Sequence, residues 1–275
     1  MTSFPRVDRI SKVAKAYKPS SSVFPTGIEC FDTATDGGLR EGELIIISGP
    51  TGMGKTTFSQ MLIANYSQAG VPSILFTYEM NPWYIQSKFE SMGHPDLHCF
   101  VPNTDPEGTL SYIEDHIKEG FDDHLCKVVF IDHLHYLIPL QESKNSSLMI
   151  GGIVRELVQM AHRTKSIIFL IAHTKKIYQD EELNLSSVRD SSLVVQEADY
   201  VFLIERLKKE RQKQKSLQDS ITEKLETNKT EWTNLAKIQL AKNRRTGDMV
   251  YEIFKMENKI FLPQNENDGT TENIF

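Results

Sequence analysis

The sequence has few cysteines and no long apolar run, and both absences narrow the class of protein. Its 275 residues include three cysteines, Cys30, Cys99 and Cys126, whose wide spacing matches no zinc or redox motif. We expect them to be reduced, buried or inert thiols of an intracellular protein. No apolar run approaches the length of a membrane span, and the N-terminus has no signal-peptide core.

A surplus of positive charge is also missing. Asp and Glu number 37 against 31 Lys and Arg, which gives a formal net charge of −6. A globally basic surface is therefore excluded, and any binding of nucleic acid must depend on a local patch. Hydrophobic residues make up 39% of the chain, which is enough for the core of one large α/β domain or two small ones.

The first 22 residues are basic and rich in serine, with Asp8 as the one acidic residue. This composition is compatible with a mitochondrial transit segment. We favour a short helix, because apolar residues at positions 7, 10, 13, 14 and 17 recur at helical spacing. A helix of this length is not stable alone in water, so we expect it to dock on its own domain or on a neighbouring subunit.

Apolar runs alternate with helical segments along most of the chain. Predicted strands cover 42–48, 72–80, 127–137, 166–174 and 200–206, and predicted helices cover 55–70, 82–92, 109–121, 147–165 and 191–199. Residues 93–108 are predicted to be loop. This order indicates an α/β fold with a mainly parallel sheet flanked by helices. Residues 232–264, with turn signals at Thr246–Gly247 and Glu257–Asn258, predict a C-terminal antiparallel hairpin.

A charged insertion at 206–231 separates these two parts and contains no aromatic residue. Such a stretch is typical of a solvated loop or an exposed helix. Its basic first half, 206–215, could instead contact a phosphate backbone.

The stretch GPTGMGKTTF, residues 49–58, follows an apolar strand and matches the pattern G-x-x-x-x-G-K-[ST]. Small residues let successive backbone N–H groups cradle phosphate oxygens at the start of the following helix. Lys55 would reach the β- and γ-phosphates, and the Thr56 hydroxyl would bind Mg²⁺. The predicted nucleotide-binding residues are Gly49, Pro50, Thr51, Gly52, Met53, Gly54, Lys55, Thr56 and Thr57.

Three further polar residues end predicted strands. Asp132 would hold Mg²⁺ with Thr56, and Glu79 would orient and deprotonate the water that attacks the γ-phosphate. Each could also be an ordinary acidic residue at a strand end. His173 could contact the γ-phosphate, although a single histidine is as often structural.

The remaining histidines, including His133 and His135, show no spacing that defines a metal site. His135 could line the same cleft as the phosphates, although a core or surface position fits it at least as well.

Residues 24–58 resemble the start of the motor domain in hexameric replicative DNA helicases of the DnaB type, phage primase–helicases and mitochondrial Twinkle. The shared lead-in is T-G-x-x-x-x-D-x-x-x-G-G-L-x-x-G-E/D-L. Its positions are Thr26, Gly27, Asp32, Gly37, Gly38, Leu39, Gly42, Glu43 and Leu44. The resemblance covers 22–262 apart from the charged insertion, and it implies a RecA-like P-loop fold.

The resemblance assigns roles to individual residues. Lys55 and Thr56 match the residues that bind the triphosphate and Mg²⁺, Glu79 the catalytic glutamate, and Asp132 the Walker B aspartate. His173 matches a position that holds glutamine in bacterial enzymes and histidine in phage and Twinkle-like enzymes.

The segment 187–206 is similar to the part of the family that grips the phosphates of single-stranded DNA. The matching residues are Arg189, Asp190 and Ser192, and Lys175 and Lys176 lie on the other predicted DNA loop. A glycine that is usual near Ser192 is absent, so the details of the grip differ here.

Residues 241–248, AKNRRTGD, are similar to the segment that places an arginine finger and a lysine on the ATP of the adjacent subunit. These would be Arg244 and Lys242, with Arg245 as the neighbour to test against Arg244. An arginine supplied in trans stabilises charge on the transferred phosphoryl group. Without the resemblance, a basic hairpin turn would explain the sequence.

The resemblance therefore implies an ATP- and Mg²⁺-dependent motor that forms a ring, expected to be hexameric, around single-stranded DNA. Primase or other replication proteins are expected partners. The expected organisation is a linker at 1–21, an ATPase domain at 22–265 and a flexible tail at 266–275. The compartment would be the cytoplasm, nucleoid or a virus-infected cell, with the mitochondrion as the alternative.

Three other functions fit the same residues. The family's N-terminal collar or primase domain is not in this sequence, so a loader or accessory ATPase is one alternative. A RecA- or KaiC-like ATPase without unwinding activity is the second. A nucleotide-binding interaction module with weak turnover is the third.

Overall fold

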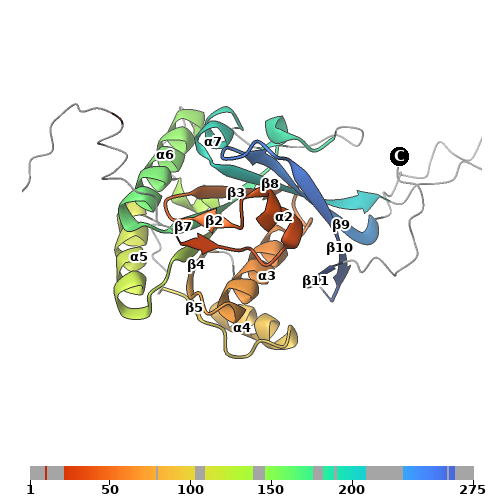
Figure 1. Cartoon of the computed structure of the whole chain (residues 1–275), viewed down its shortest axis with the longest axis horizontal. Helices are drawn as coiled ribbons and strands as arrows, with labels where there is room; N and C mark the ends of the chain where they lie inside the picture. The colour runs from red at the N-terminus through yellow and green to blue at the C-terminus, as the bar shows by residue number, and fades with distance from the viewer. Residues whose placement is uncertain are drawn as a thin grey trace, which may run out of the picture.

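A computed structural model describes residues 10, 22–78, 80–102, 109–138, 146–175, 182–188, 191–208, 232–258 and 260–263. Its centre is a nine-stranded sheet in the order β11-β10-β9-β8-β3-β7-β6-β4-β5 (Figure 1). The strands are β3 Leu44–Gly49, β4 Ser73–Thr77, β5 Cys99–Phe100, β6 Val128–Asp132, β7 Ile167–His173, β8 Tyr200–Lys208, β9 Trp232–Asn243, β10 Val250–Glu257 and β11 Ile260–Pro263.

The sheet has a parallel and an antiparallel part. Strands β5, β4, β6, β7, β3 and β8 pair in parallel, and β8, β9, β10 and β11 pair antiparallel. The prediction of a mainly parallel sheet with an antiparallel C-terminal part is confirmed. The carboxyl ends of the parallel strands meet at one edge, which is where ligands bind in open α/β sheets.

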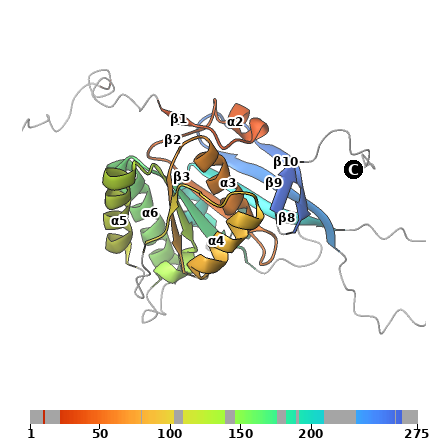
Figure 2. The same ribbon diagram turned by 90° about the horizontal axis from the view of Figure 1, so that it is seen from below.

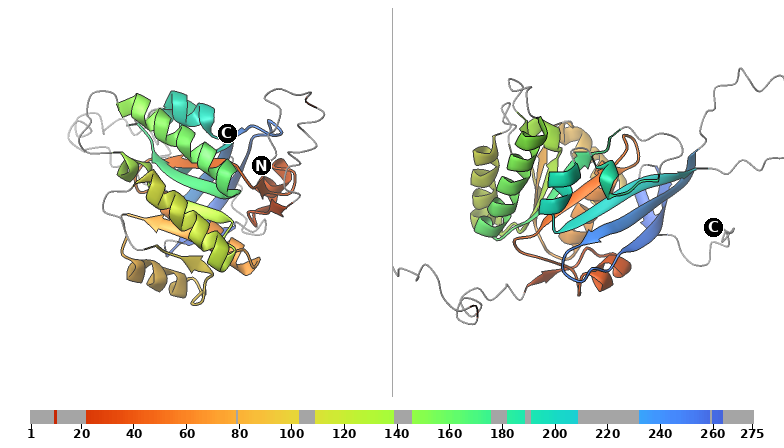
Figure 3. Two further views of the ribbon diagram at one scale, coloured as in Figure 1. Left: turned by 90° about the vertical axis from the view of Figure 1, so that its left-hand side faces the viewer. Right: turned by 90° about the horizontal axis from the view of Figure 1, so that it is seen from above.

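Helices cover both faces of the sheet. They are α2 Glu29–Ala34, α3 Lys55–Gln68, α4 Pro82–Ser91, α5 Leu110–His124, α6 Ser146–Thr164 and α7 Ser191–Glu197. Figure 2 shows α3 and α4 on one side and α5 and α6 on the other. The view in the left panel of Figure 3 faces α5, α6 and α7.

The buried strand β3 faces both helix layers. Ile45 and Ile47 pack in the cluster with α2, α3 and α4, and Leu44 and Ile46 pack in the cluster with α5, α6 and α7. Side chains alternate between the faces of a strand, so a strand with two apolar neighbours must be apolar throughout. This explains the unbroken run LIII at the start of β3.

Two predicted boundaries were wrong. The predicted loop 93–108 contains the short strand β5, and the predicted strand 127–137 ends at Asp132. Leu134–Leu137 instead forms the 3-10 helix η1. β5 was missed because a strand of two residues is too short to show an alternating pattern. η1 was taken for part of β6 because its apolar residues continue the apolar run of that strand, although they pair with no neighbouring strand.

The lead-in pattern shapes the chain before β3. Asp32 accepts hydrogen bonds from the backbone and hydroxyl of Thr26, at 2.6 and 2.8 Å, and from the Gly27 backbone at 3.0 Å. Asn65 of α3 donates to the Thr26 carbonyl at 2.8 Å. Gly27 has a positive φ of 77° and lies so close to Asn65 that a side chain would collide with it. These residues attach α2 to α3.

A small sheet completes this part, with β1 Val23–Phe24 antiparallel to β2 Leu39–Arg40. Gly38 precedes β2 with φ of 135°, and a Cβ there would lie 2.6 Å from the Phe24 carbonyl oxygen. The glycine is required because the two backbones pass so closely.

The predicted linker 1–21 and tail 266–275 fall outside the described residues, apart from Ile10. Residues 209–231 of the insertion also fall outside them, and Arg206–Lys208 belong to β8. Among the described residues, no helix is long and apolar enough to cross a membrane.

The cysteines fit the expectation of inert thiols. Cys126 is buried, and Cys30 and Cys99 are half-buried. Burial raises the pKa of Cys126 to about 11 and the pKa of Cys30 and Cys99 to about 12. A thiol with such a high pKa is almost entirely protonated at neutral pH and is a weak nucleophile.

Candidate nucleotide-binding site

The glycine-rich loop joins the carboxyl end of β3 to the start of α3, as predicted. Gly52 and Gly54 have φ of 80° and 105°, a conformation that glycine adopts easily. A Cβ on Gly54 would lie 2.6 Å from the Phe261 ring of β11. The loop therefore packs directly against β11, at the antiparallel end of the sheet.

Lys55 points back into this loop. Its Nζ donates to the carbonyl oxygens of Gly49 at 2.8 Å and Pro50 at 3.0 Å, and the residue is buried. The ammonium group is thus placed beside the loop's N–H groups at the helix N-terminus, where an anion is favoured by the helix dipole.

Thr56 and Asp132 meet as the sequence predicted. The Thr56 hydroxyl in the first turn of α3 donates to Oδ2 of Asp132 at the end of β6, at 3.0 Å. Asp132 is buried. A hydroxyl and a carboxylate together supply the hard oxygen ligands that Mg²⁺ prefers, so this pair fits that ion.

His173 ends β7 next to the loop, because β7 pairs with β3 so that His173 lies opposite Gly49. Tyr78, at the end of β4, lies beside Asp132, since its backbone N–H donates to the Asp132 carbonyl at 3.1 Å. Glu79 follows Tyr78 but lies outside the described residues, so its role stays a prediction.

Two further histidines lie beside His173, and sequence reasoning did not predict this cluster. His133 follows β6, and its ring centroid lies 4.5 Å from that of His173; His135 lies in η1, with its centroid 5.4 Å from both. From the sequence, His135 is at most a residue of the same cleft, and the histidines are not grouped into a metal site. The sequence did contain a signal for this cluster. His133 and His135 follow one predicted parallel strand and His173 ends the next, and the carboxyl ends of neighbouring parallel strands lie at the same edge of a sheet.

His133 is buried, and this burial lowers its pKa to about 4, with smaller contributions from His135 and Lys55. Its imidazole is therefore neutral at physiological pH.

The described part of the predicted DNA-binding set lies at the same edge of the sheet. The Lys175 backbone N–H donates to the Ser187 carbonyl at 2.8 Å, and Thr174 forms an isolated bridge with Val188. The chain that leaves β7 therefore lies against the chain that enters α7. Ser192 is exposed in the first turn of α7. Lys176, Arg189 and Asp190 lie outside the described residues.

Lys242 of β9 binds the carboxyl end of α7. Its Nζ donates to the carbonyl oxygens of Val195 at 2.6 Å, Gln196 at 3.1 Å and Ala198 at 2.6 Å. The last carbonyls of a helix lack partners within the helix and carry a partial negative charge, so a lysine there stabilises the helix end.

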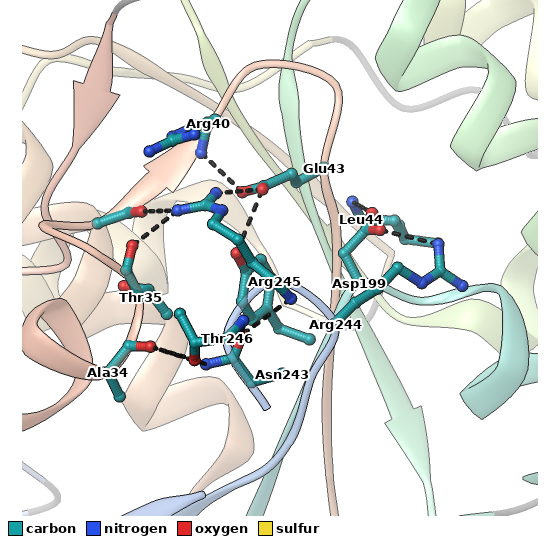
Figure 4. Close-up of polar contacts among 12 residues, drawn as sticks. Ala34, Thr35, Arg40, Glu43, Leu44, Asp199, Asn243, Arg244, Arg245 and Thr246 are labelled. Atoms are coloured by element: carbon teal, nitrogen blue, oxygen red, sulfur yellow. Dashed lines mark hydrogen bonds and ion pairs between the residues drawn. The ribbon is translucent and has the colours of Figure 1, made fainter. Parts of the chain in front are cut away.

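Arg244 binds the same region (Figure 4). Its Nη1 donates to Oδ1 of Asp199 at 2.9 Å, and its Nη2 donates to the Gln196 carbonyl at 2.6 Å. The other carboxylate oxygen of Asp199 accepts from the Leu44 backbone at 3.0 Å, at the start of β3. The Arg244 side chain is 50% exposed.

Arg245 has different surroundings (Figure 4). Its guanidinium donates to the carbonyls of Thr35 at 2.7 Å and Gly38 at 3.0 Å and to the carboxylate of Glu43, and its side chain is 18% exposed. Glu43 also accepts from the Tyr200 hydroxyl at 3.2 Å. Arg245 therefore stabilises the contact between the lead-in segment and the β9–β10 turn. Of the two arginines, Arg244 is the one that a neighbouring subunit could contact.

Arg244 and the phosphate loop lie at opposite ends of β3. Arg244 is joined through Asp199 to Leu44, five residues before Gly49. At about 3.3 Å per strand residue, this separation is roughly 16 Å. Arg244 therefore cannot serve the loop of its own chain.

The sequence matches two families. Residues 24–100 match the family described as ATPase: KaiC, and residues 96–260 match the DnaB-like helicase C terminal domain. The second match covers more than half of the chain. The chain belongs to the DnaB-like helicase C-terminal domain family.

Solved structures show that the family fold extends over almost the whole chain. One, described as an ATPase domain, has a TM-score of 0.71 at 17% identity and covers 93% of this chain and 96% of that one. A second, described as a DnaB-like replicative helicase with its interactions with primase, has a TM-score of 0.71 at 16% identity and covers 93% and 67%.

Curated relatives of this family member are similar over part of the chain. The circadian clock oscillator protein KaiC of Prochlorococcus marinus (strain MIT 9313) is 43% identical over 162 residues, covering 52% of this chain and 31% of KaiC. A UPF0273 protein of Thermotoga maritima is 40% identical over 68 residues, covering 25% and 28%. The chain thus spans about a third of the length of the curated relatives that it matches.

Proposed function

We propose that this chain is the motor part of an ATP-driven DNA helicase that works as a ring, expected to be hexameric. The observation that carries the proposal is the position of Arg244, one strand length from its own phosphate loop and half exposed. Such an arginine can complete only the site of another subunit. Membership of the DnaB-like family supports the same conclusion.

ATP would be bound by the loop 49–57, through the backbone N–H groups of its residues other than Pro50, and by Lys55. Thr56 and Asp132 would hold Mg²⁺, which neutralises charge on the phosphate oxygens. Glu79 would take the proton of the attacking water, and the bond between the γ-phosphorus and its bridging oxygen would break to release ADP. His173 would contact the γ-phosphate from the end of β7.

Arg244 and Lys242 would reach the nucleotide of the adjacent subunit. Both residues hold the carboxyl end of α7 in the isolated chain, and Ser192, one of the proposed DNA-binding residues, lies in the first turn of that helix. A helix of this length spans roughly 10 Å. Moving either cation toward a neighbour therefore removes contacts from α7 and displaces the DNA-binding segment.

DNA contacts of this kind would be made to phosphates and would carry no sequence information. Lys175, Lys176, Arg189, Asp190 and Ser192 are the proposed DNA-binding residues. Primase is a candidate partner, because one structurally similar helicase is described with primase.

Replacing Arg244 by alanine tests this proposal. We expect DNA-stimulated ATP turnover to fall by about 10³-fold or more, because a trans arginine contributes that much to phosphoryl transfer. Strand separation on a forked duplex should be lost with it. The control is Arg163→Ala on α6, an exposed arginine that pairs with Glu114 and Glu156 away from these contacts. Full turnover in the Arg244→Ala variant would refute the proposed role.

The second candidate is a KaiC-like ATPase that forms rings without unwinding DNA, or a related accessory ATPase. The identity of 43% to KaiC over 162 residues favours it. It predicts ATP hydrolysis that depends on Arg244 but does not respond to single-stranded DNA, together with no strand separation. The forked-duplex measurement therefore separates the two candidates.

A further inference from the structure

Three histidines form one cluster at the carboxyl edge of the sheet. His133, His135 and His173 each offer a ring nitrogen, and these three atoms lie within 4.8 Å of one another. This is the one group of three potential metal ligands among the described residues. His133 is buried and the other two are partly buried, so solvent does not separate the rings.

The backbone supports this arrangement firmly. β6 and β7 pair in parallel through four residue pairs, and the histidines follow from the ends of these two strands. The Tyr136 ring lies 5.0 Å from His133 and stacks on Tyr78 at 5.4 Å. The cluster is therefore built at the ends of two central strands, with two tyrosine rings beside it.

The ligand chemistry of this cluster differs from that of the Mg²⁺ pair. Imidazole nitrogens suit zinc, copper, nickel and iron, whereas Mg²⁺ is held by oxygen atoms. Three histidines with one open position are a common arrangement for zinc. A tetrahedral zinc ion with bonds of about 2.0 Å needs its nitrogens roughly 3.3 Å apart, which is a closure of about 1.5 Å at most from the separation observed.

We propose that His133, His135 and His173 bind one divalent transition-metal ion, with zinc as the ion of best fit, beside the nucleotide site. The carboxylate of Asp132 flanks the cluster, with Oδ1 4.0 Å from His133 Nδ1. This distance is longer than a hydrogen bond, so a small movement would be needed before the carboxylate could accept the ring N–H and orient His133.

Metal binding would regulate the ATPase. His173 cannot offer the same ring nitrogen to a metal ion and to the γ-phosphate, so zinc should lower ATP turnover. This consequence rests on the proposed function, whereas the binding of the metal does not.

The test uses the full chain without an affinity tag, treated with a chelator and then titrated with Zn²⁺ by calorimetry in the absence of nucleotide. We expect one ion per chain. His135→Gln should weaken binding by about tenfold or more, because loss of even an indirect partner of a metal site costs that much. The control is His124→Gln, a histidine that stacks on Phe100 at the end of α5.

Binding of Co²⁺ provides a second readout, since the visible absorption of this ion reports tetrahedral nitrogen coordination. His133→Asn should lose this signal. Should His135→Gln fold poorly, His133→Asn replaces it, and circular dichroism checks both. The proposal is overturned by an absence of saturable Zn²⁺ binding, or by equal binding in wild type and both folded variants.

ATP turnover with Mg²⁺ and increasing Zn²⁺ then separates the two proposals. Zinc inhibition in wild type and in His124→Gln that is lost in His135→Gln supports the metal site and its regulatory effect. Stoichiometric zinc binding in a chain that does not hydrolyse ATP would refute the proposed function and leave the metal site established.

Discussion

Two adjacent arginines, Arg244 and Arg245, show how different the surroundings of neighbouring residues in one turn can be. The resemblance assigns the arginine finger to Arg244, with Arg245 as the neighbour to test against it. Arg245 is bound by two backbone carbonyls and the carboxylate of Glu43, whereas Arg244 makes its contacts at the surface. Only their three-dimensional partners distinguish them.

Replacing each arginine by alanine should therefore lower the free energy of unfolding by different amounts. Arg245→Ala leaves the largely buried Glu43 carboxylate without its cation, so we expect a loss of about 2–4 kcal/mol in the free energy of unfolding. Arg244 is half exposed, so solvent screens its pair with Asp199, whose other oxygen keeps the Leu44 amide; Arg244→Ala should therefore cost about 1 kcal/mol or less. Chemical denaturation measures both values. Equal losses in the two variants would show that this division of roles is wrong.

At the same scale, the sequence predicted much of the geometry of the candidate nucleotide site. The glycines, Lys55, Thr56 and Asp132 lie where the pattern placed them, because a loop that cradles phosphate depends on local spacing and on strand order. The histidine cluster was missed, although histidines that follow two successive parallel strands were a signal for it. The Lys242 contacts could not be predicted, because they join β9 to the end of α7 and the sequence does not show that these segments are neighbours.

Among the helices and strands, too, those with a clear local sequence pattern were predicted and those that depend on distant partners were missed. Long apolar strands and helices were predicted within a few residues, since burial on both faces of a sheet imposes a clear pattern. The strands β1, β2 and β5 were missed because each has two residues and depends on pairing with a partner. The lead-in motif was recognised as a pattern, but its physical role emerged only from the hydrogen bonds of Asp32 and the close approach of Gly38 to Phe24.

The packing of α6 against α7 provides a test at the level of elements. A Cβ on Gly151 would collide with the Leu193 side chain of α7, whereas one on the adjacent Gly152 meets no atom within 4 Å. Gly151→Ala should displace α7, lower stability by about 1–3 kcal/mol and weaken DNA stimulation of ATP turnover. Gly152→Ala should be neutral or stabilising by up to about 1 kcal/mol, as alanine favours a helix.

Unfolding curves and ATP turnover with and without single-stranded DNA distinguish these two variants. If Gly151→Ala retains full DNA stimulation, then the position of α7 does not control the DNA-binding segment.

The whole molecule is predicted to work only as an assembly, and mixing two inactive variants tests this directly. Asp132→Asn removes the Mg²⁺ ligand of a subunit but keeps its arginine. Arg244→Ala does the reverse. In a ring formed at random from equal amounts, about a quarter of the interfaces join an intact phosphate site to an intact arginine, since each interface uses one surface from each neighbour.

We therefore expect co-purified mixtures of these variants to recover ATP turnover that neither variant has alone. Size-exclusion chromatography with light scattering confirms that both chains are in one assembly. A mixed assembly that remains inactive would argue that Arg244 acts within its own subunit or has no part in the reaction.

The carboxylate of Asp199 joins two regions that, in the proposed ring, face different nucleotides. One oxygen holds Arg244, and the other holds the first backbone amide of β3, whose far end is the subunit's own phosphate loop. If Arg244 turned to a neighbour's triphosphate, as proposed, Asp199 would lose this partner at the base of β3. Each protomer in a ring could thereby sense the state of the next site through its own central strand, so that hydrolysis would proceed around the ring in sequence.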